Sequence, residues 1–559
     1  MLRFVARTAR AGSRRREPDL GRGDRSLRAR TAHGMVVMGA STGGQALLQL
    51  GFLTVLARLL TPEDFGVVSG ALIIVFLATA IAESGVGQAI IQRAELTVAH
   101  MRVGWTLSVL TGLISFALVF VLAPAIEDLL RLDGLVPILR VLAVMFVLNG
   151  LTLSDFLLSR RLHFGRLAGA ELASYAVGYG GVAVTLALLG FGPWAIVWGQ
   201  LGQSAMRALL VTVLAPYPYR PSLERRVAGE LLNFGAGLTL GRIASWAATQ
   251  VDNVVVGRYL GAAALGFYGR AYQLVQMPAN LFGQVANEVL FPAMAARQDD
   301  LRTLRRVFGM GVGVLTALAL PVSVLAAATS EPLVRLLLGD QWLPLRAAFD
   351  IIIFGLLFRT TSKLTDALMK ARGAVYRRAV RNTVFAVLVF VGAYVGQRWG
   401  LHGVAVGVLV ALGLNYAYSA QLCLRLIEMR WREFAAAHLP ALAPAVAAGA
   451  IGLGARWALA PADAPPAVEV AVAWPLAILV CLMLVRLAPR SALLRPLARL
   501  GVELHATLPG TMRRWFGRVL GGAYASSLRT VQPPDAPADR LAGLAADEHA
   551  ETRVGGELG

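Results

Sequence analysis

Long apolar runs, separated by short basic or Gly/Pro-rich links, recur along most of this 559-residue chain. Each run has about 17 residues or more, which is enough for a helix to cross a hydrocarbon core of about 30 Å. A helix satisfies its own backbone hydrogen bonds, which lipid cannot do. The pattern therefore predicts an all-α integral membrane protein of about fourteen transmembrane helices. The expected spans are 36–57, 67–91, 103–123, 136–155, 170–190, 193–214, 233–256, 266–294, 307–328, 347–369, 380–398, 401–424, 437–458 and 467–486.

Composition excludes several other classes of protein. Hydrophobic residues make up 57% of the chain, charged residues 15%, and the net charge is +20. Most basic residues lie in short loops between apolar runs, where membrane topology accounts for them, and no nucleic-acid motif accompanies them. We therefore expect no nucleic-acid partner. The two cysteines, Cys423 and Cys481, lie inside apolar runs, and we expect no disulfide framework, metal site, cofactor or catalytic residue.

The two ends of the chain differ from the apolar middle. Residues 1–34 carry ten arginines and no apolar run, which predicts a disordered basic arm rather than a cleavable signal peptide. Residues 488–530 are basic with scattered apolar residues, a composition typical of an amphipathic segment on the cytoplasmic membrane surface. Residues 531–559 are rich in Pro, Ala and acidic residues, and we expect a disordered tail.

Arginine and lysine are concentrated in the loops that follow even-numbered spans. Examples are the loops within 160–166, 220–226, 297–306 and 370–381. By the positive-inside rule these loops face the cytoplasm, and so do both termini. We expect a multi-pass protein of the bacterial inner (cytoplasmic) membrane.

An internal repeat relates the two halves of the chain. Val55, Arg58, Leu60, Gly66 and Ala71 recur two hundred positions later as Val255, Arg258, Leu260, Gly266 and Ala271. This shift equals six expected helices, so both halves have the same orientation, as in transporters with parallel repeats. The repeat predicts an N-lobe over 35–214 and a C-lobe over 215–430, each of six helices, with two further helices within 431–487.

Three motifs resemble those of the polysaccharide-exporter family, the O-antigen and colanic-acid type flippases. They are Leu56 to Gly66 (LARLLTPEDFG), Gln250 to Gly261 (QVDNVVVGRYLG), and Leu265 to Leu274 (LGFYGRAYQL) continuing to Leu290-Phe-Pro-Ala293. The likeness covers roughly residues 35–430. This family belongs to the multidrug/oligosaccharidyl-lipid/polysaccharide superfamily.

The resemblance implies a V-shaped, two-lobed bundle that moves an undecaprenyl-diphosphate-linked oligosaccharide from the cytoplasmic to the periplasmic leaflet by alternating access. The product would enter O-antigen, capsule or exopolysaccharide synthesis, with a glycan polymerase and export machinery as possible partners. It implies no enzyme activity and no nucleotide hydrolysis, and the chain has no Gly-rich Lys-Ser/Thr phosphate loop.

Charged residues inside the expected spans are the candidate site. A charge at the membrane centre costs roughly 2.5–3.5 kcal/mol on insertion scales, so such residues usually face protein or a wet cavity. Arg359, Lys363 and Asp366 share one face of the span 347–369, because they are spaced i, i+4 and i+7. Arg242 and Asp252 lie in the span 233–256.

Two functional interpretations of these charges remain open. In the first, Arg242, Arg359 and Lys363 line a cationic lumen for the diphosphate, because arginine meets phosphate oxygens in a bidentate fork. The residues that would pair with them in the empty site, or take a coupling proton or sodium ion, are Glu83, Asp252, Glu288 and Asp366. In the second, Lys363 pairs with Asp366, and Arg359 caps a neighbouring helix.

Other functions share parts of this pattern. A lipid II flippase handles the same diphosphate, whereas a cation-coupled multidrug exporter typically needs an acidic, aromatic-lined cavity. A polytopic glycan-processing enzyme generally needs a large extramembrane loop with catalytic groups, and the loops between the expected spans are short. The excess of arginine and lysine inside the spans favours an anionic cargo.

Overall fold

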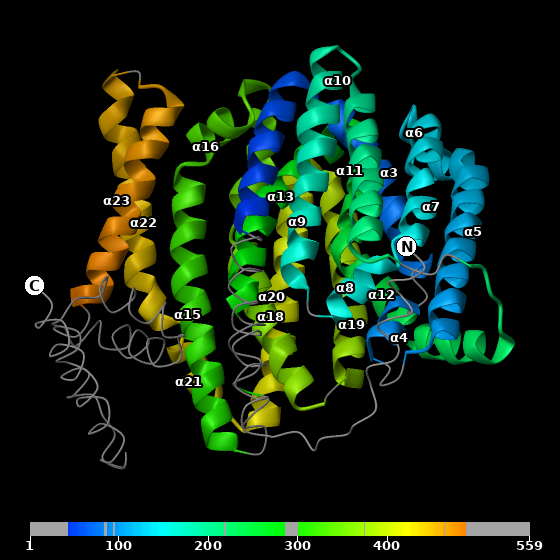
Figure 1. Ribbon diagram of the computed structural model, residues 1–559. Coiled ribbons are helices and arrows are strands. Elements are labelled where there is room, and N and C mark those ends of the chain that lie inside the picture. Colours follow the sequence, from blue (N-terminus) through cyan, green and yellow to red (C-terminus); the bar gives the residue numbers. More distant parts are fainter. Residues whose placement is uncertain are drawn as a thin grey trace, which may run out of the picture. The chain divides into compact units, whose positions relative to one another are not determined.

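The computed structural model describes residues 43–82, 86–92, 96–161, 163–216, 220–285, 294, 300–373, 375–462 and 464–487 (Figure 1). Regular structure in these residues is helical throughout, without a strand, so the predicted all-α class is confirmed for them. The expectations for 1–34, 488–530 and 531–559 lie outside the described residues.

Helices of the first half begin with one over residues 43–59. The others are α3 (Pro62–Ala82), α4 (Val86–Gln92), α5 (Val98–Leu130), α6 (Leu135–Leu142), α7 (Val144–Leu151), α8 (Ser154–Arg160), α9 (Phe164–Tyr175), the π-helix η1 (Ala176–Ala183), α10 (Val184–Leu188) and α11 (Pro193–Leu214). The start of α3 is set by reciprocal capping, because the Asp64 carboxylate accepts from the Thr61 amide at 2.9 Å and the Thr61 hydroxyl accepts from the Asp64 amide at 3.2 Å.

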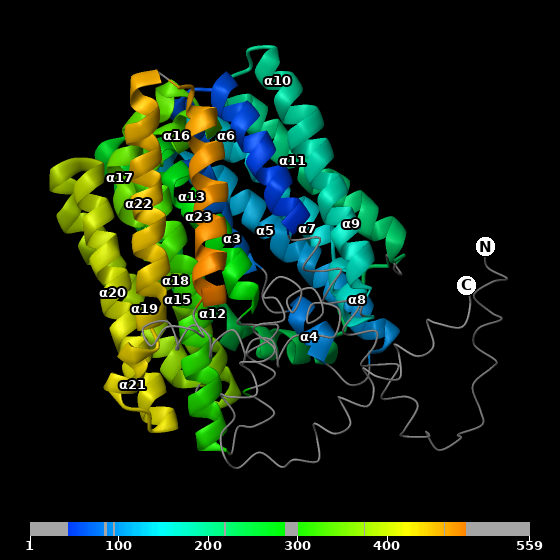
Figure 2. The ribbon, with the colours of Figure 1, turned by 90° about the vertical axis from the view of Figure 1, so that its left-hand side faces the viewer.

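The helices from residue 225 onward include two long ones, α12 (Arg225–Leu260) and α13 (Ala262–Val285), joined at Gly261. After α13 the same compact unit continues with α16 (Ser330–Leu337), the 3-10 helix η3 (Asp340–Leu345), α17 (Arg346–Ile352), α18 (Gly355–Ala371), α19 (Val375–Gly396), η4 (Gln397–Trp399) and α20 (Gly400–Ile427). α19 and α20 run side by side (Figure 2).

A second compact unit contains α15 (Leu301–Ala328), α21 (Trp431–Ala436), η5 (Leu439–Ala441), α22 (Leu442–Leu459), η6 (Ala460–Ala462) and α23 (Pro466–Leu487). Within it, α15 packs on α22, and α22 packs on α23 (Figure 1). Leu325 lies in a small apolar cluster with Ala448 and Ala473, and the Trp474 indole donates to the Thr329 hydroxyl at 3.3 Å. α15 comes from the middle of the segment expected as the C-lobe, yet it packs with the helices that follow residue 430.

Two of the expected spans are bent. The span expected at 136–155 is divided into helices over 135–151 and Ser154–Arg160, which meet at an angle of 44°. The span expected at 347–369 is divided into helices over 340–352 and 355–371, which meet at an angle of 51°. The described residues contain seven helices long and apolar enough to cross a membrane, or up to nine if each bent pair counts as one span. The long helices α12 and α13, which carry buried polar groups, are not in that set.

Contacts between the two halves of the first unit join the ends of helices. The Arg58 guanidinium donates to the Leu336 carbonyl at 2.8 Å, and Arg258 donates to the Leu129 carbonyl. The indole of the fully buried Trp342 donates to the Ala57 carbonyl at 2.7 Å. α13 packs on α3 from the first half and on α12 and α18 from the second, and it therefore lies where charged side chains from several helices meet.

Candidate functional site

A buried carboxylate on α12 is held by a tyrosine on α13. The Tyr268 hydroxyl donates to one Asp252 oxygen at 2.8 Å, and the Asn253 amide donates to the other at 3.0 Å. Asp252 is 1% exposed and Tyr268 is fully buried. Hydrogen bonds to both oxygens offset part of the cost of burying this carboxyl group.

Arg359 on α18 lies against the next tyrosine along α13. Its guanidinium donates to the Tyr272 hydroxyl at 2.5 Å, and its central carbon lies 4.1 Å from the centroid of the same ring. The rings of Tyr268 and Tyr272 are 6.2 Å apart. Asp252, Tyr268, Tyr272 and Arg359 thus form one cluster, which we call the arginine–tyrosine cluster.

The guanidinium of Arg359 has no carboxylate in direct contact within the described part of the chain. Among the described residues Arg359 forms no ion pair, and its buried Nε has no hydrogen-bond partner. A neutral hydroxyl and a π-face are weaker counterparts for a guanidinium than a carboxylate or phosphate is. Arg359 therefore keeps donor capacity for an anion.

Lys363, one turn further along α18, also reaches α13. Its ammonium donates to the Asn280 side-chain oxygen at 2.9 Å and to the Ala279 carbonyl at 3.1 Å. The aliphatic part of Lys363 crosses Gly283, where a Cβ would collide with it. Arg359 and Lys363 thus present two cations to the same helix, and each is bound by neutral groups.

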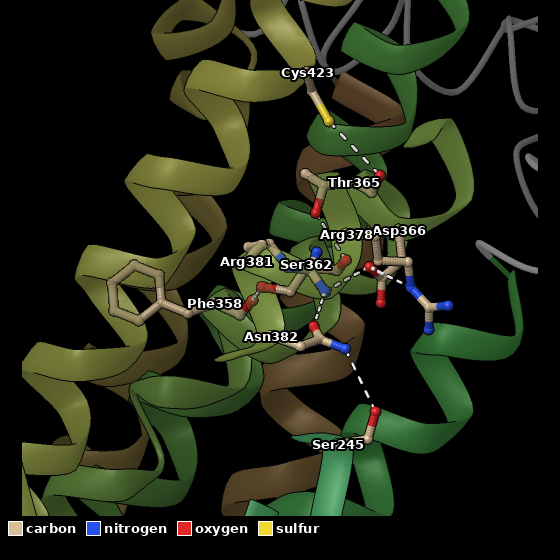
Figure 3. Close-up of polar contacts among 9 residues, drawn as sticks. All are labelled: Ser245, Phe358, Ser362, Thr365, Asp366, Arg378, Arg381, Asn382 and Cys423. Carbon is tan, nitrogen blue, oxygen red and sulfur yellow. Dashed lines mark hydrogen bonds and ion pairs between the residues drawn. The ribbon is translucent and has the colours of Figure 1, made fainter. Parts of the chain in front are cut away.

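Asp366 belongs to a different network, at the end of α18 (Figure 3). Its Oδ1 forms ion pairs with Arg381 at 2.6 Å and with Arg378 at 3.3 Å, both from α19. Arg381 also donates to the Asn382 side chain, which donates to the Ser245 hydroxyl of α12 at 3.4 Å (Figure 3). Asp366 therefore joins α18 to α19 and does not pair with Lys363, which donates to α13 instead.

The other predicted residues lie elsewhere. Arg242 is partly buried on α12, roughly 15 Å along the helix axis from Asp252 at 1.5 Å per residue. Glu83 and Glu288 lie outside the described residues. The structure thus brings Arg359, Lys363 and Asp252 to adjoining helices, whereas Asp366 faces α19, and the roles assigned to all seven residues stay predictions.

Three residues of the motif Leu265 to Leu274 lie at or next to this site, although no role was predicted for them. Tyr268 and Tyr272 are spaced i, i+4, which places them on one helix face and would have indicated a shared site. Arg270 on the same helix lies 4.7 Å from the Phe65 ring centroid, donates to Gln273, and has a buried Nε without a hydrogen-bond partner in the described part of the chain.

A second charged group lies among the helices of the first half. The Arg207 guanidinium on α11 pairs with Asp155 at 3.2 Å and with Glu171, and the Gln45 amide donates to Glu171 at 3.3 Å. These residues are far apart in sequence, and their charges alone did not indicate that they meet. Across the described ranges no three His, Cys, Asp or Glu residues are grouped as metal ligands.

The fold and the charged side chains described above define a helical membrane protein with cations among its helices, and comparison with known proteins agrees with this fold. The family model described as "Polysaccharide biosynthesis protein" matches residues 55–347, more than half of the chain. The chain belongs to this family, and the resemblance seen in its motifs is confirmed.

Two relatives and one solved structure are informative. The chain is 29% identical over 398 residues to the lipopolysaccharide biosynthesis protein WzxC of Escherichia coli (strain K12), covering 70% of this chain and 80% of that protein. It is 31% identical over 325 residues to the succinoglycan biosynthesis transport protein ExoT of Rhizobium meliloti (strain 1021), covering 56% and 63%. Its fold is similar to that of the lipid II flippase MurJ in an inward closed conformation, with a TM-score of 0.65 and 13% identity over 80% of this chain and 98% of that one.

Proposed function

We propose that this protein flips an undecaprenyl-diphosphate-linked oligosaccharide from the cytoplasmic to the periplasmic leaflet of the bacterial inner membrane, for surface polysaccharide synthesis. The observation that carries the proposal is the environment of Arg359. This cation lies among the helices, and the partner to which it donates is a neutral tyrosine hydroxyl. A diphosphate would give Arg359 an anion in direct contact, and Lys363 adds a second donor one turn away. Membership of a polysaccharide biosynthesis family supports a lipid-linked glycan as cargo.

The proposed architecture has fourteen spans, with two six-helix lobes over 35–214 and 215–430 in a V shape and two further helices. The paired contacts of Arg58 with Leu336 and of Arg258 with Leu129 support it, because each arginine ends an equivalent helix and reaches into the opposite half. Alternating access would then rock one lobe against the other around a lumen lined by Arg242, Arg359 and Lys363. Both termini would be cytoplasmic.

A coupling ion would act through a titratable group beside the cations. Asp252 is the described acidic residue that shares the arginine–tyrosine cluster, and Tyr268 holds its carboxyl group in place. Proton uptake at Asp252 would remove a negative charge next to Arg359 and so change the affinity of the lumen for an anion. Sodium is the alternative ion, and a glycan polymerase and export machinery are the partners that would consume the product.

The test uses the native bacterium with the gene deleted. Lipid extracts are analysed by mass spectrometry for undecaprenyl-diphosphate oligosaccharides, while surface polysaccharide is measured on the same cells. The proposal expects the lipid-linked oligosaccharide to accumulate and the surface glycan to be lost, with both restored by the wild-type gene. Normal lipids together with normal surface glycan would contradict it.

A second candidate is the flipping of lipid II, since the fold is similar to that of a lipid II flippase and the diphosphate is shared. The same deletion distinguishes the two, because lipid II and not a surface-polysaccharide precursor would then accumulate. A multidrug exporter would leave both lipids unchanged and alter the sensitivity of the cells to cationic drugs.

A further inference from the structure

A polar cavity of about 330 Å³ lies among the helices of the first half, apart from the residues of the arginine–tyrosine cluster. Its walls come from α3, α4, α5, α7, α8 and α11. Several of its lining residues are hydroxyl or amide side chains, and the charged ones among the described residues are Asp155 and Arg207. The polar lining side chains used below are Ser108, Asn149, Asp155, Gln203, Ser204 and Arg207.

The cavity offers hydrogen-bonding groups that the protein itself does not use. The side chains of Asn149, Gln203 and Ser204 make no hydrogen bond to another residue that the structure describes. Asp155 uses Oδ2 for Arg207, whereas its buried Oδ1 has no partner among the described residues. A buried carboxylate oxygen without a hydrogen-bond partner is destabilising, so a ligand that donates to it would be favoured.

The charge balance disfavours the diphosphate as the occupant. Among the described residues that line the cavity the cation is Arg207, and it already pairs with two carboxylates, Asp155 and Glu171. Amides and hydroxyls donate and accept, whereas an ionised carboxylate only accepts. A neutral ligand with many hydroxyl groups satisfies this set, because each hydroxyl also donates and accepts.

The size of the cavity and the packing around it suit a part of a glycan. A volume of 330 Å³ is at the lower end of the range for small-ligand pockets, about 300–1,000 Å³, so it admits part of an oligosaccharide rather than a whole repeat unit. α11 is held against the π-helix η1, since Gly178 leaves room for the backbone at Gln203, and the Tyr179 hydroxyl donates to Gln200 at 2.5 Å. The lining side chains of α11 are thereby placed before a ligand arrives.

We propose that this cavity binds sugar residues of the transported lipid-linked oligosaccharide through their hydroxyl groups. It is a second subsite, distinct from the diphosphate site at Arg359 and Lys363, and the assignment rests on the proposed function. Asn149, Gln203 and Ser204 contact the sugar, and Asp155, oriented by Arg207, accepts from a hydroxyl. Selectivity for the glycan would then arise in the first half of the chain, and affinity for the diphosphate in the second.

The experiment compares two lipids on the purified full-length protein in nanodiscs. One probe is undecaprenyl diphosphate, and the other is the lipid-linked oligosaccharide purified from the deletion strain. Wild type is expected to bind the sugar-bearing lipid more tightly. The double variant Asn149→Ala/Gln203→Ala loses two neutral hydrogen bonds to the ligand, which predicts a binding of that lipid that is weaker by roughly five- to a hundredfold. Its affinity for undecaprenyl diphosphate is expected to stay unchanged.

Control variants distinguish an effect on ligand binding in the cavity from an effect elsewhere in the protein. Gln88→Ala removes the same amide from an exposed position of α4 outside the cavity and should change neither affinity. Arg359→Ala should weaken the binding of both lipids. Ser204→Ala, a milder change, replaces the double variant if that variant has a lowered melting temperature, and it should reduce the affinity for the sugar-bearing lipid alone.

Three results would overturn the proposal. Equal wild-type affinity for the two lipids excludes a sugar subsite and leaves the flippase function standing. If the cavity variants weaken the binding of both lipids equally, or of neither lipid, this cavity is excluded as the sugar subsite. Failure of wild type to bind the lipid-linked oligosaccharide at all contradicts the proposed function as well.

Discussion

Gly66 and Gly266 pack reciprocally at the starts of α3 and α13. A Cβ at Gly66 would collide with the Ala262 carbonyl, and a Cβ at Gly266 would collide with the Pro62 carbonyl. The two glycines are equivalent positions of the internal repeat, and reciprocal contacts of this kind are expected across a two-fold axis. The repeat seen in the sequence therefore corresponds to a close contact between the two halves.

The first prediction follows from that contact. Gly66→Ala and Gly266→Ala should each destabilise the protein by about 1–3 kcal/mol, because the new methyl group meets a backbone carbonyl that cannot turn aside. The measurement is the melting temperature of the purified protein. Gly229→Ala is the matched control, since that helical glycine has open space around it, and it should be neutral or slightly stabilising. Unchanged melting temperatures for all three variants would exclude a close contact in solution.

The second prediction concerns Arg359. Arg359→Ala should strongly reduce surface polysaccharide in the complemented deletion strain at normal membrane abundance, because one lost charge-assisted hydrogen bond of about 1.5–3 kcal/mol lowers diphosphate affinity at least roughly tenfold. Arg359→Lys should restore part of the activity, since lysine keeps the charge but loses the planar fork. Surface glycan and immunoblotted abundance are measured together.

The control for Arg359 is Arg225→Ala, which removes an exposed arginine at the start of α12 and should leave surface glycan unchanged. A loss of Arg359→Ala protein from the membrane, in parallel with the loss of glycan, would instead assign Arg359 a folding role.

The third prediction tests Asp252 as the coupling group. Asp252→Asn keeps the shape of the side chain and removes its titration, so proton-driven transport in proteoliposomes should fall to the level seen without a gradient, while lipid binding is retained. Asp128→Asn, an exposed carboxylate near the end of α5, should transport normally. Full transport by Asp252→Asn under an imposed proton gradient would exclude this residue, and stimulation of wild type by a sodium gradient alone would identify sodium as the coupling ion.

The fourth prediction separates structure from transport at Asp366. Its partner Arg381 has a side chain only 5% exposed, so Asp366→Ala leaves a buried cation without its anion and should cost about 3–5 kcal/mol. Arg378→Ala removes a partner that is 37% exposed and should cost less than about 1 kcal/mol. Melting temperature and membrane abundance report the difference.

An additional variant checks the cause at Asp366. Asp366→Leu/Arg381→Met removes both charges of the buried pair and should recover much of the stability lost in Asp366→Ala. A double variant no more stable than Asp366→Ala would show that the ion pair is not what holds α18 against α19.

Local sequence patterns determined several properties of this protein directly. Hydropathy of single segments predicted helices, because a long continuous apolar run in lipid satisfies its backbone hydrogen bonds within the segment as a helix. The motif around Tyr268 and Arg270 indicated the family, and the spacing of Arg359 and Lys363 placed both on one face of α18, which the structure shows contacting α13. Each of these inferences depends on neighbours within a few residues.

Only the tertiary structure decided which partners those residues have. Asp366 has cations available at Lys363 and on α19, and the packing of α18 against α19 selected Arg378 and Arg381. Asp155 and Arg207 are fifty-two positions apart and meet because α8 and α11 come together. A periodic pattern specifies the face of a helix, whereas the choice of partner depends on which helices adjoin and how far their side chains reach, and these are properties of the packed chain.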